Sequence, residues 1–326
     1  MDTVTQRAGV RRLRGVALAG AVMALTASFL PMASAARHHS AGNKAAAPGA
    51  VRVVVVGDIA CDPADPQFRG GRGTATACGQ RAVGRLVERL RPDAVVTTGD
   101  NQYDVGALRA YRASYAPAMG SLRARTWPVP GNHDYGTAGA AGYFAYFGAR
   151  AGSPNRPWRS FSPAPGWRVL LLDSNCWAVG GCGSGSRQHR WIKHTLAHRP
   201  APCTIAAWHH PLLTAGEYRG SADVRAAALP LWRATTRGGV DVVLNGHDHN
   251  YQRWSPRQGV REFVVGTGGR SHYRVTPVPR LAAHDDRHFG ALVLTLRADR
   301  TYRYAFWTVH HRRLDAGRGR CANSPG

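Results

Sequence analysis

Six short apolar runs recur along the chain from residue 51 onward. They cover residues 51–56, 94–98, 169–172, 204–208, 240–244 and 263–265. The runs are rich in Val and Leu and do not alternate with polar residues, which is typical of strands buried on both faces. Between the first two, residues 83–90 carry Val and Leu at helical spacing, and Pro92 marks the end of the helix. A strand, a helix and a strand in this order predict an α/β fold.

The remaining segments predict one domain over residues 51–326. Residues 291–309 are typical of a C-terminal β-hairpin, because two arms rich in strand-forming residues flank the turn at 298–300. Long loops rich in Gly and Pro occupy residues 61–79, 136–166 and 176–186. Loops of that length in a compact domain usually carry function or are cross-linked. Neither a repeat nor a second core is visible.

The first 35 residues have the features of a secretory signal peptide. Four Arg residues precede an apolar stretch at 15–30, and Ala33-Ser34-Ala35 forms an A-x-A cleavage site. The stretch is short for a membrane span, which needs about 20 residues, and an uncleaved anchor is the alternative. Arg11-Arg12 leaves twin-arginine export open beside Sec export. We expect a disordered leader at 36–50 and a secreted or extracytoplasmic protein without a stable membrane span in its mature form.

Six cysteines predict three disulfides, because their count is even and the chain is expected to be exported. Sequence proximity favours Cys61 with Cys78 and Cys176 with Cys182, which leaves Cys203 with Cys321. A zinc site is the alternative, but no C-x-x-C spacing supports it.

The chain is strongly basic, with 43 Lys and Arg against 19 Asp and Glu and a formal net charge of +24. A field of that sign attracts anions, such as phosphate esters, nucleic acid and anionic wall polymers. The basic residues are scattered, so the alternative is that they only keep the surface soluble.

Five polar blocks each place Asp, Asn or His at the carboxyl end of an expected strand, the edge where α/β sheets assemble their sites. The blocks are GDIACD at 57–62, GDNQY at 99–103, PGNHDY at 130–135, WHHP at 208–211 and NGHDHNY at 245–251. Their donors are carboxylate, amide and imidazole groups without a thiolate, a set that suits Zn, Mn or Fe. Carboxylates and imidazoles brought together need positive charge among them, which two metal ions sharing one carboxylate would supply.

In order and spacing, these blocks resemble the calcineurin-like metallophosphoesterase superfamily, and specifically its purple acid phosphatase-like branch. The likeness covers about residues 51–254. It implies a four-layered α/β/β/α sandwich with mixed sheets and a dinuclear metal centre. By this resemblance six residues are ligands: Asp58 and His249 for the first metal, Asn132, His209 and His247 for the second, and Asp100 bridging both. Asp58 and Asp100 could instead be N-caps of the helices that follow them.

Tyr103 is the expected further ligand of the first metal. Many members of the superfamily carry a His two positions after the first Asp, where this chain has Ala60. Tyr103, three positions after Asp100, fits the phenolate ligand of purple acid phosphatases, although it could also be an ordinary loop residue. A phenol has a reference pKa of about 10, and ferric iron is the partner best able to displace its proton. The expected cofactors are therefore Fe(III) with Fe, Zn or Mn, and the alternative is a di-Mn or di-Zn centre.

The resemblance makes His133 the general acid of a hydrolysis by metal-bound hydroxide. An ester oxygen leaves poorly unless it is protonated or bound to a metal. Acid phosphatases of this type carry another His shortly after the HxP block, where this chain has Glu217 and Tyr218. Tyr218 and His210 are the candidate substrate contacts, and His210 could also simply cap its strand. Asp134 is interpreted as an ordinary loop residue.

Two functions follow from these residues. The first is an exported binuclear-metal phosphatase for phosphate monoesters, with diesters or nucleotides as further candidate substrates. The alternative is a catalytically weak polyanion-binding protein on the same fold, although such a protein has no need of a general acid or a bridging carboxylate. Serine hydrolase chemistry has no support, because GCGSGS at 181–186 contains no Ser with Gly two positions away on both sides.

Overall fold

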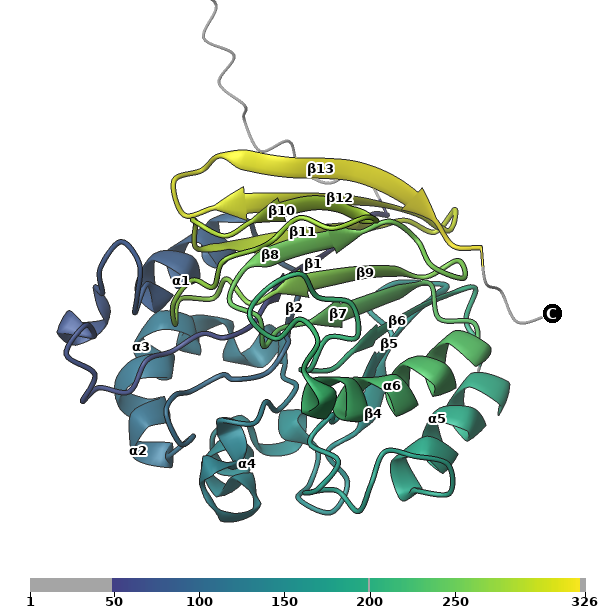
Figure 1. The fold of residues 1–326 in the computed structure, drawn as a ribbon, viewed down its shortest axis with the longest axis horizontal. Helices are drawn as coiled ribbons and strands as arrows, with labels where there is room; N and C mark the ends of the chain where they lie inside the picture. The colour runs from purple at the N-terminus through teal and green to yellow at the C-terminus, as the bar shows by residue number, and fades with distance from the viewer. Residues whose placement is uncertain (1–48, 199, 323–326) are drawn as a thin grey trace, which may run out of the picture. The chain divides into compact units, whose positions relative to one another are not determined.

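A computed structural model describes residues 49–198 and 200–322 (Figure 1). These residues all fall in one compact unit, Asn43–Gly326. The expected signal peptide and residues 36–48 of the expected leader lie outside the described residues. Within the described part of the chain, no helix has both the length and the apolar character that a membrane crossing requires.

Two mixed β-sheets form the centre of the fold. The first contains β1 (Val51–Val56), β2 (Ala94–Thr97), β3 (Thr126–Trp127), β11 (Gly290–Leu296), β12 (Thr301–Thr308) and β13 (Arg313–Arg320). The second contains β4 (Arg159–Phe161), β5 (Trp167–Leu171), β6 (Cys203–Ala207), β7 (Val242–Asn245), β8 (Tyr251–Trp254), β9 (Arg261–Val265) and β10 (Leu281–Asp285). Their strand orders are β13-β12-β11-β1-β2-β3 and β10-β8-β9-β7-β6-β5-β4. The strands β1-β2-β3 run parallel, as do β5-β6-β7-β9, and the other pairs are antiparallel.

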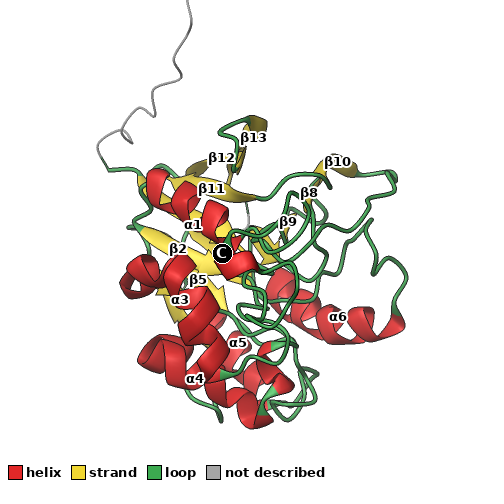
Figure 2. Cartoon of the chain, turned by 90° about the vertical axis from the view of Figure 1, so that its left-hand side faces the viewer, coloured by secondary structure: helices red, strands yellow, loops and turns green. Residues whose placement is uncertain are grey.

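Helices cover the outer face of each sheet, which makes four layers (Figures 1 and 2). The first sheet carries α1 (Gln80–Arg89), α2 (Leu108–Ala110), α3 (Ala116–Met119) and α4 (Ala141–Phe147), and the second carries α5 (Arg187–His198) and α6 (Ala222–Arg237). The short 3-10 and π segments are Arg69–Gly71, Tyr111–Tyr115, Gly120–Arg125, Asp134–Gly136, Ala138–Ala140 and Gly148–Ala151. The predicted α/β/β/α sandwich is confirmed.

Alternate residues of the central strands fill two different cores. Val53 and Val55 of β1 pack between the sheets, where Ile205 of β6 meets them. Val54 and Val56 point the other way, into the core beneath α1 and α4. Because both faces are apolar, these strands carry no alternation in the sequence, as expected for buried strands.

The segment 136–166, which we expected to be a loop, contains α4 and β4. Tyr143, Tyr146 and Phe147 are buried, and Tyr111 stacks on Tyr146 with ring centroids 5.0 Å apart. Burial of these rings stabilises a helix that is too short for its periodicity to be recognised.

The expected hairpin is formed by β11 and β12, and β13 adds a third strand to it. The sequence of β13 is polar and rich in Gly, so it carries no strand signal. Gly317 lies opposite Tyr304 in the β12–β13 pairing, and Gly319 lies opposite Tyr302. Each tyrosine ring covers the glycine that it faces. The aromatic rings on β12 therefore supply the packing that the glycines of β13 lack.

Three disulfides join Cys61 to Cys78, Cys176 to Cys182, and Cys203 to Cys321. This is the pairing that sequence proximity favoured. The first two close loops that we expected to be cross-linked, and the third ties the start of β6 to the C-terminal tail. Asp241 supports the third, because its carboxylate accepts from the Thr204 amide at 2.9 Å and from the Ala322 amide at 3.0 Å.

The third disulfide should contribute the most to stability. It spans a sequence separation of 118, against 6 for Cys176–Cys182. On the chain-entropy model, replacing both Cys203 and Cys321 by Ser lowers the free energy of unfolding by about 5 kcal/mol, and the matched Cys176/Cys182 replacement lowers it by about 2 kcal/mol. Urea unfolding of both variants measures the difference, and equal losses would contradict the loop-length account.

Candidate metal centre

The polar blocks meet at the edge where the parallel strands of the two sheets end. The side chains come from four strand ends and one loop: Asp58 after β1, Asp100 and Tyr103 after β2, Asn132 in the loop after β3, His209 after β6, and His247 and His249 after β7. All seven metal ligands predicted from the sequence therefore come from one edge of the fold.

One group of donor atoms surrounds the Tyr103 hydroxyl. Its oxygen lies 3.0 Å from Asp58 Oδ1, 2.9 Å from Asp100 Oδ2 and 3.0 Å from His249 Nε2. His249 Nε2 lies 3.4 Å from Asp58 Oδ1. Four ligating groups thus converge on one buried point.

A second group of donor atoms surrounds His209 Nε2. This nitrogen lies 3.3 Å from Asp100 Oδ2, 3.1 Å from Asn132 Oδ1 and 3.1 Å from His247 Nδ1. One atom each of Asp100, His209 and His247 could hold a metal ion together, since all three lie within 4.8 Å of one another. The same oxygen, Asp100 Oδ2, belongs to both groups.

Hydrogen bonds behind two of the imidazoles fix the nitrogen that each presents to the cluster. His209 Nδ1 lies 2.8 Å from the Thr98 carbonyl oxygen, which can only accept, so Nδ1 carries the proton. His249 Nδ1 lies 2.7 Å from Ser271 Oγ. Both contacts leave Nε2 directed at the cluster, the arrangement that orients imidazole ligands in metal sites.

The backbone is strained at three of these strand ends. Asp58, Asp100 and His247 have positive φ angles of 59°, 47° and 70°. The left-handed region costs a residue other than Gly roughly 1–2 kcal/mol. Each of the three follows a Gly, and a Cβ on Gly246 would collide with the Asp58 carboxylate. Strain of this kind persists where packing enforces it and is concentrated at functional sites.

Charge in the cluster is balanced through buried imidazoles. Burial opposes ionisation of Asp100, but the neighbouring His209 more than offsets this, and the pKa of Asp100 lies well below its ordinary value. Burial also opposes protonation of His209, yet Asp100 raises the pKa of His209 to about 9. Burial together with Asp100 and Asp58 raises the pKa of Tyr103 well above 10. Two carboxylates and a phenolate can therefore coexist here only beside added positive charge.

His133 lies at the solvent side of the cluster. Its Nδ1 is 2.6 Å from the Asp104 carbonyl oxygen, so Nδ1 donates and Nε2 is left free. Nε2 lies 4.0 Å from Asp100 Oδ2, and the side chain is 38% exposed. The ring also packs against Tyr103, with centroids 4.3 Å apart.

Asp134 is not the ordinary loop residue that we inferred. Its carboxylate is fully buried and accepts from the Gly131 amide at 2.9 Å, from Asn101 Nδ2 at 2.9 Å and from Tyr111 Oη at 2.6 Å. Burial and the nearby Asp100 raise the pKa of Asp134 to about 6. These bonds hold the loop that carries Asn132 and His133 against the end of β2.

Two tyrosines stack on imidazoles of the predicted ligand set. Tyr218 lies over His247 with ring centroids 3.9 Å apart, and Tyr273 lies over His249 at 4.0 Å. His210 packs beside His247 at 4.4 Å and contacts Ser174 Oγ through Nδ1 at 2.7 Å. Burial and His209 lower the pKa of His210 to about 3, so its imidazole is neutral.

Several of these supporting residues were not found in the sequence. Ser174 follows β5, and Ser271 and Tyr273 follow β9. Their position could have identified them, because they follow two further buried strands. The five polar blocks were selected in the same way, as polar residues that follow the carboxyl end of a buried strand.

Comparison with known proteins agrees with this geometry. The family model of the calcineurin-like phosphoesterases matches residues 51–251. Tartrate-resistant acid phosphatase type 5 of Sus scrofa is 27% identical over 271 residues, which cover 74% of this chain and 76% of that protein. An uncharacterized protein of Mycobacterium tuberculosis is 29% identical over 245 residues, 67% of this chain. The chain spans only 44% of the length of that mycobacterial relative.

Solved structures share the fold. A purple acid phosphatase from yellow lupin (Lupinus luteus) has a TM-score of 0.65 at 19% identity, over 82% of this chain and 53% of its own. A dimetal phosphatase from Danio rerio has a TM-score of 0.54 at 16% identity, over 83% of this chain and 99% of its own. The resemblance to the purple acid phosphatase-like branch is thereby confirmed. The chain belongs to the calcineurin-like phosphoesterases, a family of metal-dependent phosphoester hydrolases with a dinuclear metal centre.

Proposed function

We propose that the chain is an exported binuclear-metal phosphatase that hydrolyses phosphate monoesters, with diesters or nucleotides as further substrates. One observation carries the proposal: Asp100 Oδ2 lies 2.9 Å from Tyr103 Oη and 3.3 Å from His209 Nε2. A single carboxylate oxygen thus lies between two groups of ligating atoms. Three disulfides and the expected signal peptide support export.

The donor set fits two metal ions. Asp58, Tyr103 and His249 would hold one, and Asn132, His209 and His247 the other, with Asp100 shared between them. Oxygen and imidazole donors without thiolate suit Fe, Zn or Mn. Once bound, such a pair supplies a nucleophile from water at neutral pH and offsets negative charge on the phosphate.

The side chains around the centre supply the other two functions, proton transfer to the leaving group and contact with the substrate. His133 holds its Nδ1 proton on the Asp104 carbonyl, so Nε2 is the atom that delivers a proton to the leaving ester oxygen. His210 and Tyr218 stand beside His247, where they would contact the phosphate or its substituent.

Replacing His133 with Ala should lower turnover about 10²-fold or more while the metal content stays near two per chain, because general acid catalysis typically contributes that much. The loss should be smaller for p-nitrophenyl phosphate than for an alkyl phosphate, since nitrophenolate leaves without a proton. Asp100→Asn is the matched control, and it should lose metal, because its neutral amide replaces the shared carboxylate. Loss of metal from His133→Ala, measured by elemental analysis, would make His133 a ligand and contradict the assignment.

Tyr103 decides which metals the centre uses. A phenolate on ferric iron gives a charge-transfer band in the visible, so protein loaded with iron under oxidising conditions should be purple to pink. Tyr103→Phe should remove the band, while Tyr218→Phe should keep it, because Tyr218 stacks on His247 and is not one of the donor groups. A colourless iron-loaded wild type, or colour that survives Tyr103→Phe, would favour a di-Mn or di-Zn centre instead.

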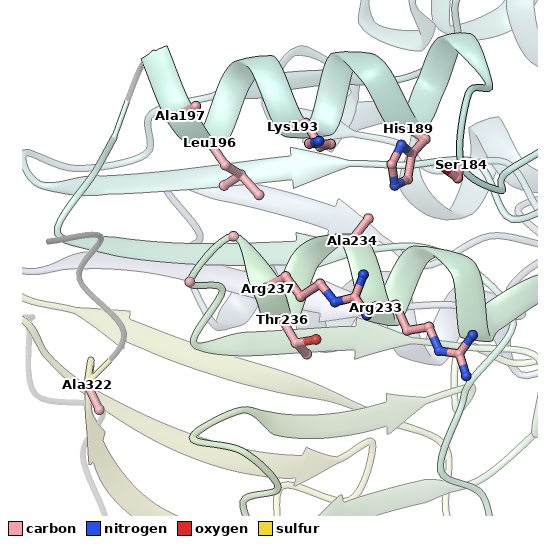
Figure 3. Close-up of a pocket in the computed structure, with 12 residues that line it drawn as sticks. Ser184, His189, Lys193, Leu196, Ala197, Arg233, Ala234, Thr236, Arg237 and Ala322 are labelled. Carbon is pink, nitrogen blue, oxygen red and sulfur yellow. The ribbon is translucent and has the colours of Figure 1, made fainter.

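The polyanion-binding alternative has one observation in its favour. A groove of about 750 Å³ between α5 and α6 is lined by His189, Lys193, Arg233 and Arg237, without an acidic side chain (Figure 3). An adjoining groove of about 280 Å³ shares both arginines and adds Arg225 and Arg257. Arg233 and Arg237 make no ion pair with any described residue. This basic groove could hold a linear chain of phosphates. It could do so in a chain that is also an active phosphatase, or in a chain that binds polyanions without turnover.

A double variant tests the groove. Arg233→Glu with Arg237→Glu should weaken binding of inorganic polyphosphate at least tenfold at low salt and flatten its salt dependence, because two phosphate contacts are lost. Arg85→Glu with Arg112→Glu, on exposed residues of the other helix layer, is the control with the same change in net charge. Equal binding by both variants would contradict a specific groove. Tight polyphosphate binding by metal-replete wild type without any ester turnover would favour the binder over the phosphatase.

A further inference from the structure

Two large apolar side chains are exposed among the described residues, Trp177 at 73% and Val105 at 44%. A single exposed apolar residue is normal on a protein surface. These two, however, lie against the same short segment, the turn Asp134–Gly136 that directly follows His133. That coincidence places both beside the proposed general acid.

Trp177 flanks the turn on one side. Its ring lies edge-on to that of Tyr135, with centroids 5.5 Å apart and an interplanar angle of 66°. Tyr135 is itself fixed, because its hydroxyl donates to Asp173 Oδ2 at 2.6 Å. The Cys176–Cys182 disulfide closes the loop that carries Trp177, and Asn175 Nδ2 bonds to the Pro130 carbonyl at 3.4 Å. The exposed indole is therefore held in place by a cross-linked loop that is attached to the His133 loop.

Val105 contacts the same turn at Gly136. A Cβ on Gly136 would lie 2.6 Å from Val105 Cα, so the two backbones are in direct contact. Val105 also follows Asp104, whose carbonyl accepts from His133 Nδ1 at 2.6 Å. The Asp104 carboxylate turns toward Arg270, at 3.4 Å from its guanidinium. The acidic side chain that directly precedes Val105 is thus already paired.

The position of a general acid indicates where the rest of the substrate lies. An acid that protonates the leaving oxygen must stand on the side of the phosphorus where the alcohol departs. Whatever is esterified to the phosphate therefore lies on the His133 side of the phosphorus, and Val105 and Trp177 both contact the turn that follows His133.

We propose that Val105 and Trp177 form a leaving-group subsite, which selects phosphate monoesters whose alcohol carries an aromatic ring. Val105 packs against the atoms next to the ester oxygen, and the indole of Trp177 stacks on the ring. This inference rests on the proposed phosphatase function and names the substrate class of the same site. An exposed indole fixed by its loop gives such stacking at little cost in side-chain entropy.

The test compares 2-naphthylmethyl phosphate with ethyl phosphate on metal-loaded protein. Both release alkoxides that need a proton, so their kcat/KM ratio reports ring recognition rather than leaving-group basicity. Trp177→Ala should lower the ratio about tenfold, which corresponds to about 1.4 kcal/mol, and Val105→Ser should lower it as well. Trp177→Phe should restore most of it, since a ring remains.

Failure of the subsite and failure of the phosphatase proposal give different results. If both esters turn over and Trp177→Ala keeps the wild-type ratio, the subsite is wrong and the phosphatase stands. If wild type hydrolyses neither ester, the phosphatase is wrong, and calorimetry with 2-naphthylmethylphosphonate and methylphosphonate decides the subsite. A preference for the naphthyl compound that disappears in Trp177→Ala supports it, and equal affinities overturn it.

Discussion

Burial of two carboxylates at neighbouring strand ends is the constraint on which the rest of the site depends. Asp58 and Asp100 have almost no contact with solvent. An ionised carboxylate loses several kcal/mol of solvation on burial unless positive charge or hydrogen bonds replace the water. Three imidazoles, a phenol and an amide gather around the pair, and the His247 backbone amide donates to Asp58 at 3.0 Å. Bound cations would add positive charge to this cluster, so its position in the fold favours the proposed metal-dependent chemistry.

The fold tolerates this cluster because the strands beneath it are rigid. The central strands are apolar on both faces, and they hold Asp58, Asp100 and His247 in left-handed backbone conformations that none of these residues prefers. Asp134 contributes from a loop, where it ties the Gly131 amide to the end of β2. The core thus determines where the ligands stand, and a few buried polar bonds extend that rigidity to His133.

The central buried strands and the convergence of the polar blocks could be predicted from the sequence, because buried strands lack alternation and polar residues that end them stand out. No apolar run predicted the strands β3, β4, β8, β10 and β13. The supporting residues could not be predicted either. Asp134, Ser271 and Trp177 lie in loops without periodicity, and their roles depend on partners far along the chain, such as His249 for Ser271. Likewise, α4 and β13 owe their stability to aromatic partners, Tyr111 for α4 and Tyr304 for β13, rather than to their own patterns. Local sequence patterns therefore predict which side chains lie at the strand ends. The roles of the loop residues depend on tertiary contacts, which these patterns do not show.

The difference between strand ends and loops also separates the residues proposed for the reaction from those proposed for substrate specificity. A net charge of +24 favours the approach of any phosphate, and the proposed ligands at the strand ends would contact only the phosphate group that all phosphate esters share. In the proposed mechanism the alcohol leaves beside His133, so discrimination between esters must come from groups that contact the alcohol there. The segments that border His133 are loops, one closed by the Cys176–Cys182 disulfide and the other anchored by the Asp104 carbonyl. The disulfide-closed loop carries no proposed ligand, so its exposed Trp177 can change without disturbing the proposed ligands, whereas the other loop also carries Asp100 and Tyr103. Substrate choice can therefore vary at Trp177 while the proposed chemistry stays the same.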